Sequence, residues 1–194
     1  SYVSVIGGGA NPRPGEVTLA HRGILFLDEF PEFDKRVIES LRQPLEEGYV
    51  SISRSKGSAL FPANVTLVAA MNPCPCGFRG SREKQCRCTA SDLARYERKL
   101  SGPIMDRIDI HIEVGPISYA ELDSKEKSGE SSPVIRERVL KARNKQTERF
   151  NGTKHLRLNS DMSARDVSEI IKLDEECIKL LHESSERLKL SARA

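Results

Sequence analysis

Two adjacent carboxylates follow an apolar run in the first part of the 194-residue chain. The run is Ile24–Leu27, and Asp28 and Glu29 come directly after it. Such a run is typical of a strand in a parallel sheet, and the carboxyl ends of parallel strands face the ligand crevice. There the first acid could hold Mg²⁺ through its water shell, and the second could orient a water for attack on a phosphate. An ordinary charged turn after a strand is the alternative, because an Asp-Glu pair alone is common.

A second apolar run and an arginine-containing turn follow these carboxylates along the chain. Val65–Ala70 predicts another buried strand, and Asn72 comes two residues after it. Arg107 lies in a short turn before Ile108–Val114, where alternating apolar and polar residues predict a further strand. The chain thus has, in order, a strand followed by two acids, a strand followed by an amide, and a turn with an arginine. This order resembles that of Walker B, sensor 1 and arginine finger in AAA+ ATPases.

Four of the five cysteines form a candidate metal site. They are paired as Cys74-Pro75-Cys76 and Cys86-Arg87-Cys88. Four thiolates in one short loop suit a tetrahedral Zn²⁺, which would stabilise a loop that has few apolar residues. The C-x-C spacing is less specific than C-x₂-C, so disulfides and four unconnected thiols remain as alternatives. The fifth cysteine, Cys177, lies on an apolar helical stripe and is expected in a core.

Basic residues lie in two predicted loops and along one predicted helix. Arg13 lies in the first loop, and Arg54 and Lys56 lie at the tip of a predicted hairpin. Cations at loop tips could contact a phosphate backbone, although a solvated turn is the simpler interpretation from the residues alone. The helix after Pro133 is also basic, and we interpret it first as a charged, solvent-facing surface and second as a DNA surface.

Composition restricts the protein class. The chain has 31 Lys and Arg against 28 Asp and Glu, a formal net charge of +3, and 38% hydrophobic residues. Its longest apolar run, Val65–Met71, is far shorter than the roughly 20 residues of a membrane span. These values exclude membrane, secreted disulfide-rich, collagen-like and wholly disordered classes, and we expect a cytoplasmic location.

The pattern of the first part predicts an α/β core over residues 1–117. We expect a loop over residues 1–15, a helix from Asp34 to Gly48 with a kink at Pro44, a β-hairpin over residues 49–61 and a helix over residues 90–100. The two continuous apolar strands are expected to be buried on both faces of a parallel sheet.

The second part is expected to be all helical. The polar residues 118–133 predict a linker, and residues 134–194 predict a helical lid. Ser132 and Ser163 are the expected caps of the first two helices, and Asp174–Leu188 is the expected third helix. The chain begins in an apolar segment and ends just after Ser191, which could cap a further helix, so we expect it to be a fragment of a longer protein.

Four segments carry a closer resemblance that covers nearly the whole chain. They are residues 7–16 (GGGANPRPGE), 23–33 (GILFLDEFPEF), 69–77 (AAMNPCPCG) and 190–194 (LSARA). Together they resemble the magnesium-chelatase-like AAA+ ATPases, and within that family the competence-protein branch. The resemblance implies the C-terminal part of a P-loop ATPase core, with a parallel sheet, helices and a β-hairpin insertion, followed by an all-α lid.

The resemblance also implies roles for single residues. Asp28 would hold Mg²⁺ of Mg-ATP, Glu29 would polarise the hydrolytic water, and Asn72 would be sensor 1. Arg107 would be the finger that reaches a neighbouring subunit's ATP in a ring, and Arg193 would be sensor 2, on an ATP phosphate. The loop with Arg13 and the hairpin with Arg54 and Lys56 would point into the pore of a ring, a hexamer in this family, and contact DNA.

The sequence departs from the family at one motif, since Gly-x-x-x-x-Gly-Lys-[Ser/Thr] does not occur. We therefore expect an ATPase as the full-length protein and no activity from this chain alone. The leading function is a DNA-remodelling motor, for branch migration or helicase-like work in natural transformation or recombination. A chelatase motor that drives Mg²⁺ into a porphyrin and a non-enzymatic, zinc-stapled nucleic-acid module are the alternatives.

Overall fold

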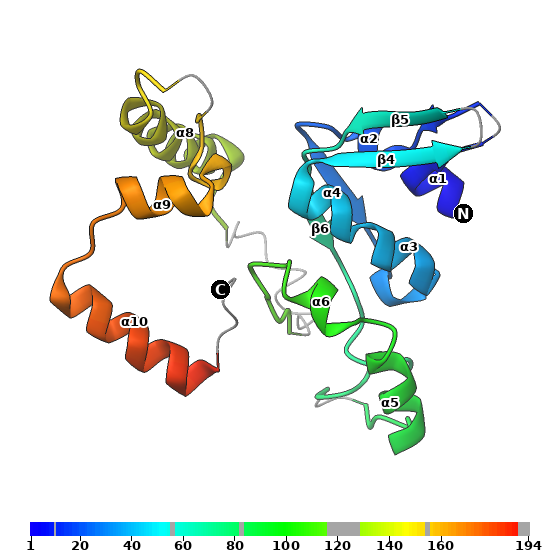
Figure 1. Cartoon of the computed structure of the whole chain (residues 1–194). Helices are drawn as coiled ribbons and strands as arrows, with labels where there is room; N and C mark the ends of the chain where they lie inside the picture. Colours follow the sequence, from blue (N-terminus) through cyan, green and yellow to red (C-terminus); the bar gives the residue numbers. More distant parts are fainter. Residues whose placement is uncertain (10, 55–56, 82–83, 116–128, 154–155, 190–194) are drawn as a thin grey trace. The chain divides into compact units, whose positions relative to one another are not determined.

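The chain divides into two units with different secondary structure. The computed structural model describes residues 1–9, 11–54, 57–81, 84–115, 129–153 and 156–189. The first unit, Ser1–Val114, is mixed α/β and contains every strand described, whereas the second, Gly115–Leu190, is helical (Figure 1). This is the predicted fold class, an α/β part with a parallel strand pair followed by an all-α part.

Two parallel strands form the centre of the first unit. Strand β3 (Ile24–Leu27) pairs with β6 (Thr66–Ala69), with Leu27 opposite Ala69. Hydrogen bonds continue the ladder beyond both strands: the Ala70 N–H donates to the Leu27 carbonyl, and the Phe30 N–H donates to the Ala70 carbonyl, each at 2.9 Å. The carboxyl ends of the two strands therefore lie at one edge, as predicted.

Only one face of β3 is buried, so the expectation of two-sided burial is wrong for the described residues. Leu25 and Leu27 lie in the core, whereas Ile24 and Phe26 are 68% and 59% exposed. Successive side chains of a strand point to opposite faces. Helix residues such as Val37 and Ile38 pack in the same core as the buried pair, and no described element covers the opposite face.

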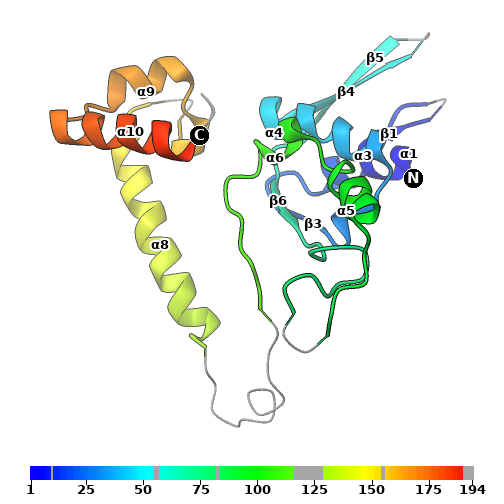
Figure 2. The ribbon, with the colours of Figure 1, turned by 90° about the horizontal axis from the view of Figure 1, so that it is seen from below.

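A hairpin and a broken helix complete this core. Strands β4 (Tyr49–Arg54) and β5 (Gly57–Pro62) are antiparallel, which confirms the predicted hairpin, and Figure 2 shows it extending beyond the neighbouring helices. Helices α3 (Lys35–Ser40) and α4 (Arg42–Glu47) replace one predicted helix. The break follows from Pro44, because a proline ring clashes with the carbonyl four residues earlier.

Both ends of that helix pair are capped as the sequence predicts. The Asp34 carboxylate accepts a hydrogen bond from the Arg36 N–H at 2.7 Å. Gly48 ends α4 with φ 71°, a left-handed conformation that glycine adopts at little cost.

The first 15 residues are not a loop, so that expectation is wrong. They form helix α1 (Tyr2–Ile6), strand β1 (Gly7–Gly8) and strand β2 (Arg13–Pro14), and α2 (Glu16–Leu19) follows. The spacing of Tyr2, Val5 and Ile6 is that of one helical face, and the last two are buried. The many β-branched residues obscured that period in so short a segment.

The region after β6 contains two helices and lacks one predicted strand. Helix α5 (Ala90–Glu97) begins with a capping box between Thr89 and Asp92, and α6 (Gly102–Met105) is a short addition. Residues 108–114 form no strand, although a strand was predicted there. Apolar and polar residues do alternate in this segment, but no described strand pairs with it. The apolar residues Ile110, Ile112 and Val114 are each at least 75% exposed.

The described residues of the second unit form three α-helices and a short 3-10 turn. They are α8 (Ser132–Arg149), the turn η2 (Asn159–Asp161), α9 (Ala164–Ile170) and α10 (Glu175–Leu188). Ser163 caps α9 as predicted, whereas Ser131, not Ser132, is the N-cap of α8. Asp174, the first residue of the predicted third helix, is the N-cap of α10. Cys177 is exposed, so its predicted core position is wrong in the described structure. Most of the predicted linker, residues 118–128, lies outside the described residues.

Close backbone packing of Gly7 and Gly15 yields a stability prediction. A Cβ at position 15 would lie 2.4 Å from the Gly7 nitrogen and 2.5 Å from the Val5 carbonyl oxygen. Gly15→Ala should therefore lower the free energy of unfolding by about 1–3 kcal/mol, the usual cost of overpacking. Gly102→Ala is the matched control, because a Cβ there meets nothing within 4 Å. Urea unfolding of both variants checks this, and equal stabilities would contradict it.

Candidate functional site

The predicted carboxylates lie where the sequence places them, directly after β3. Asp28 and Glu29 are both exposed, so a ligand in solvent can reach them. The Asp28 Oδ1 accepts a hydrogen bond from the Glu29 N–H at 2.8 Å, which holds that carboxylate against the turn. Two exposed carboxylates in a fixed turn suit a hard, hydrated cation such as Mg²⁺.

Glu29 has an unusual backbone conformation. Its φ and ψ are 50° and 43°, in the left-handed region that a non-glycine residue enters at a cost of about 1 kcal/mol or more. The next residue explains it: Phe30 is 1% exposed in the core, and its N–H is bound to the Ala70 carbonyl. The chain must therefore turn sharply at Glu29. Strain of this kind is common at functional sites.

Asn72 lies beyond β6 and is held by a residue that sequence reasoning missed. Its carbonyl oxygen accepts a hydrogen bond from the Tyr96 hydroxyl at 2.9 Å, and Tyr96 is only 7% exposed on α5. Desolvation, followed by the negative charges of Glu32, Cys74 and Glu29, raises the pKa of Tyr96. Tyr96 is thus near both Glu29 and the first cysteine. A single tyrosine on a predicted helix carries no sequence signal for this role.

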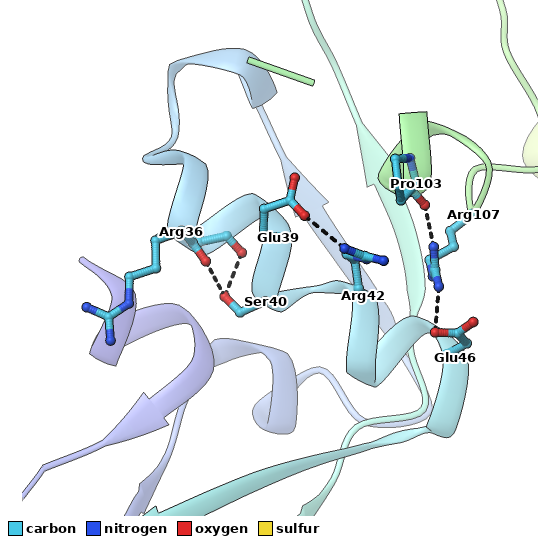
Figure 3. A network of polar contacts seen from close by, with 8 residues as sticks. Arg36, Glu39, Ser40, Arg42, Glu46, Pro103 and Arg107 are labelled. Carbon is cyan, nitrogen blue, oxygen red and sulfur yellow. Dashed lines mark hydrogen bonds and ion pairs between the residues drawn. The ribbon is translucent and has the colours of Figure 1, made fainter. Parts of the chain in front are cut away.

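Arg107 lies just after α6 and is paired within its own chain. Its Nη2 lies 2.6 Å from Oε2 of Glu46 on α4, and its Nη1 donates to the Pro103 carbonyl (Figure 3). The side chain is only 11% exposed, and its Nε is buried without a partner among the described residues. In this arrangement the guanidinium does not extend freely into solvent. Glu46, 61 residues away, could not be identified as its partner from the sequence.

The four clustered cysteines are brought together in space. The Sγ atoms of Cys74, Cys76, Cys86 and Cys88 all lie within 4.8 Å of one another. None is in a disulfide, so that alternative does not hold in this structure. Backbone N–H groups of Phe78 and Arg87 lower the pKa of Cys76 to about 6, whereas desolvation raises the pKa of Cys88 to about 12.

The candidate nucleic-acid residues are only partly described. Arg13 is exposed and lines a shallow hollow together with Asn11, Gly8 and Gly9. Arg54 ends β4, while Lys56 and the predicted sensor 2 residue Arg193 lie outside the described residues. Along α8, surface ion pairs such as Lys141 with Glu137 at 2.8 Å fit a solvated charged face. Among the described helices, none combines the length and apolar composition that a bilayer span requires.

The family models of magnesium chelatase match both units of the chain. The model described as magnesium chelatase, subunit ChlI, matches residues 1–122, and the model of the ChlI C-terminal part matches residues 129–194. The chain belongs to the magnesium chelatase ChlI family. This confirms the resemblance drawn from the sequence motifs, and it places the protein among AAA+ ATPase-type proteins.

Individual relatives support the same branch of the family. The chain is 40% identical over 195 residues to the uncharacterized protein YifB of Escherichia coli K12 and to the competence protein ComM of Haemophilus influenzae. Each match covers 100% of the chain and 37% of the relative, so the chain spans little more than a third of their length. DNA replication licensing factor Mcm6 of Drosophila melanogaster is 30% identical over 96 residues, which is 50% of the chain and 10% of that protein.

The strained turn at Glu29 yields a prediction about stability. Glu29→Gly should raise the free energy of unfolding by about 1 kcal/mol, because glycine enters the left-handed region without the Cβ clash. Glu16→Gly is the matched control: it also removes an exposed carboxylate, but from the first turn of α2, and should destabilise. Chemical denaturation measures both, and a loss of stability in the Glu29 variant would contradict the strain assignment.

Proposed function

We propose that the complete protein is a ring-forming AAA+ ATPase that couples ATP hydrolysis to the remodelling of DNA. The observation that supports it best is the edge where β3 and β6 end, with two exposed carboxylates after one strand and Asn72 after the other. Parallel strands bind ligands at their carboxyl ends. Branch migration or helicase-like work in transformation or recombination is the activity we favour.

The residues at this edge fit the hydrolytic half of an ATP site. Asp28 would bind Mg²⁺, which neutralises phosphate charge when present. Glu29 would orient and polarise the attacking water, and its hydrogen-bonded turn supplies the fixed position that a general base needs. Asn72 would lie between Glu29 and the terminal phosphate. The sequence has no Gly-x-x-x-x-Gly-Lys motif. We therefore propose ATP hydrolysis for the complete protein and still predict that this chain alone is inactive.

Arg107 remains our candidate for the finger that acts on a neighbouring subunit's ATP. Its planar cation suits phosphate oxygens, and in this structure Glu46 supplies a carboxylate in their place. When two subunits dock, the Arg107 guanidinium would have to exchange Glu46 for the phosphate of the neighbouring subunit. Before docking, the ion pair with Glu46 would keep the guanidinium in position and limit its binding to other anions. Arg193 stays the predicted sensor 2 residue.

DNA is the partner that the relatives favour. One full-length match is named a competence protein, and a half-length match is named a DNA replication licensing factor. The exposed Arg13 would contact the phosphate backbone, as would Arg54 and Lys56, which the sequence predicts at the hairpin tip. Such contacts give affinity without base specificity.

The family description favours a second candidate, a chelatase motor that drives Mg²⁺ into a porphyrin. The competence-protein match over the whole chain and the four-cysteine cluster favour the DNA motor instead. Stimulation of ATP turnover discriminates between the two candidates. DNA should stimulate turnover by a DNA motor, whereas a porphyrin with its chelatase partners should stimulate turnover by a chelatase motor.

Glu29→Gln in the complete protein tests the hydrolytic assignment. ATP binding should be retained while turnover falls by about 10²–10⁴-fold, the usual contribution of a general base. Glu16→Gln, which neutralises an exposed carboxylate at the start of α2, should leave turnover unchanged. Steady-state phosphate release and equilibrium nucleotide binding are the measurements. Undiminished turnover in the Glu29 variant would overturn the assignment.

Arg13→Ala tests the DNA contact. In the complete protein it should weaken binding of single- and double-stranded DNA regardless of sequence and reduce the salt dependence, log Kd against log salt, by about one unit. Arg165→Ala is the control, because that exposed arginine on α9 is paired with Glu169 at 2.8 Å. Fluorescence anisotropy at several salt concentrations measures both slopes, and identical slopes would exclude Arg13 from the interface.

A further inference from the structure

Three of the four sulfur atoms of the cluster are spaced about as in a tetrahedral metal site. Cys74 Sγ lies 3.4 Å from Cys76 Sγ and 3.8 Å from Cys86 Sγ, and the latter two are 3.6 Å apart. A Zn–S bond of 2.3 Å in a regular tetrahedron gives sulfur–sulfur edges of about 3.8 Å. A disulfide would need about 2.05 Å. The three distances among Cys74, Cys76 and Cys86 fit a shared metal and not a covalent bond, and Cys88 Sγ lies within 4.8 Å of the other three.

The loop that carries the cluster has no core of its own. Phe78 is its one large apolar side chain among the described residues, and it is partly exposed under the Lys84 ammonium. The turn after Cys74 is closed by the Gly77 N–H, which donates to the Cys74 carbonyl at 3.0 Å. Cys74 itself is fully buried. Four converging thiols in a loop without apolar packing are typical of a structural metal centre.

Backbone N–H groups and one guanidinium lie near the sulfurs. The backbone N–H groups of Phe78 and Arg87 face Cys76, and Arg79 lies close enough for the charges of Cys74 and Cys86 to act on it. Arg79 is itself held by Glu97 on α5 at 2.7 Å. Backbone donors and a nearby guanidinium of this kind orient metal-bound sulfur and offset its charge.

The cluster also joins two segments that contact each other. Cys74 comes two residues after Asn72, and Cys88 comes directly before Thr89, the N-cap of α5. Tyr96 on α5 donates back to the Asn72 carbonyl. A bond between the two ends of the loop would therefore fix the start of α5 relative to the end of β6, and with it the position of Asn72.

We propose that Cys74, Cys76, Cys86 and Cys88 bind one structural Zn²⁺ that fixes Asn72 relative to α5. Zinc is favoured over the harder Mg²⁺ and Ca²⁺ because all four donors are sulfur. The site requires no ATP binding, so it holds independently of the proposed ATPase function.

Metal analysis of the 194-residue chain, purified without added metal, tests the ligand set. The parent should contain about one zinc per chain, and Cys86→Ser and Cys88→Ser should retain it at least about tenfold more weakly, since even outer-shell changes cost that much. Cys177→Ser is the matched control, because Cys177 is exposed on α10 and outside the cluster. Iron in place of zinc, or less than a tenth of a zinc per chain, would overturn the proposal.

Thiol titration of the unsubstituted chain tests the metal site even if a cysteine variant fails to fold. Of the five cysteines, one, Cys177, should react rapidly in the native protein, and all five should react after a chelator removes the metal. Five rapidly reacting thiols in the folded, untreated chain would contradict the metal site.

Hydrogen exchange tests the positioning role separately. Chelation should raise amide exchange over residues 71–78 and at the start of α5, while the hairpin β4–β5 stays protected. The Tyr96→Phe variant is a second experiment. It removes the hydrogen bond to the Asn72 carbonyl and should raise amide exchange around Asn72, while the chain still contains one zinc. Unchanged exchange after zinc removal would show that the metal does not position Asn72.

Discussion

The hydrogen bond from the Phe30 N–H to the Ala70 carbonyl is the constraint on which the site depends. It extends the β3–β6 ladder past both strands, so that their ends meet at one edge. Because Phe30 is also buried in the core, the chain has to reverse at Glu29 and adopts a left-handed conformation there. The backbone position of the two acidic residues thus follows from a backbone bond and one buried phenylalanine, and the bond from the Glu29 N–H to Asp28 Oδ1 then holds the Asp28 carboxylate against the turn.

The end of β6 is held from the other side by α5. Tyr96 on α5 donates to the Asn72 carbonyl, and Lys99, two residues after α5 ends, pairs with Glu32 at 2.8 Å. The two contacts therefore join α5 and the turn after it to the segments that follow β6 and β3. The exposed ion pair contributes little, about 0–1 kcal/mol, whereas losing the buried hydroxyl's partner would cost about 1–3 kcal/mol. Tyr96 is therefore the stronger of the two anchors, and it connects the hydrolytic edge to the cysteine loop.

Local patterns explain what could be predicted from the sequence. The caps Asp34 and Ser163, the hairpin at Gly57 and the acids after β3 each depend on a few neighbouring residues. Several of the errors concern contacts between separate elements. The partners Tyr96 and Glu46 lie 24 and 61 positions from Asn72 and Arg107. The one-sided burial of β3 depends on which other elements pack against the strand, which no local period encodes. The roles of the site residues stay predictions, since geometry alone does not establish them.

The most direct test of the central claim is a structure of the complete protein with Mg²⁺ and a non-hydrolysable ATP analogue. The account predicts that the terminal phosphate lies at the shared edge of β3 and β6, with Glu29 and Asn72 beside it and Asp28 toward the metal. The left-handed turn at Glu29 and the Phe30–Ala70 bond should persist in that complex. A nucleotide bound away from this edge, or a Glu29 that has left the turn, would contradict the account.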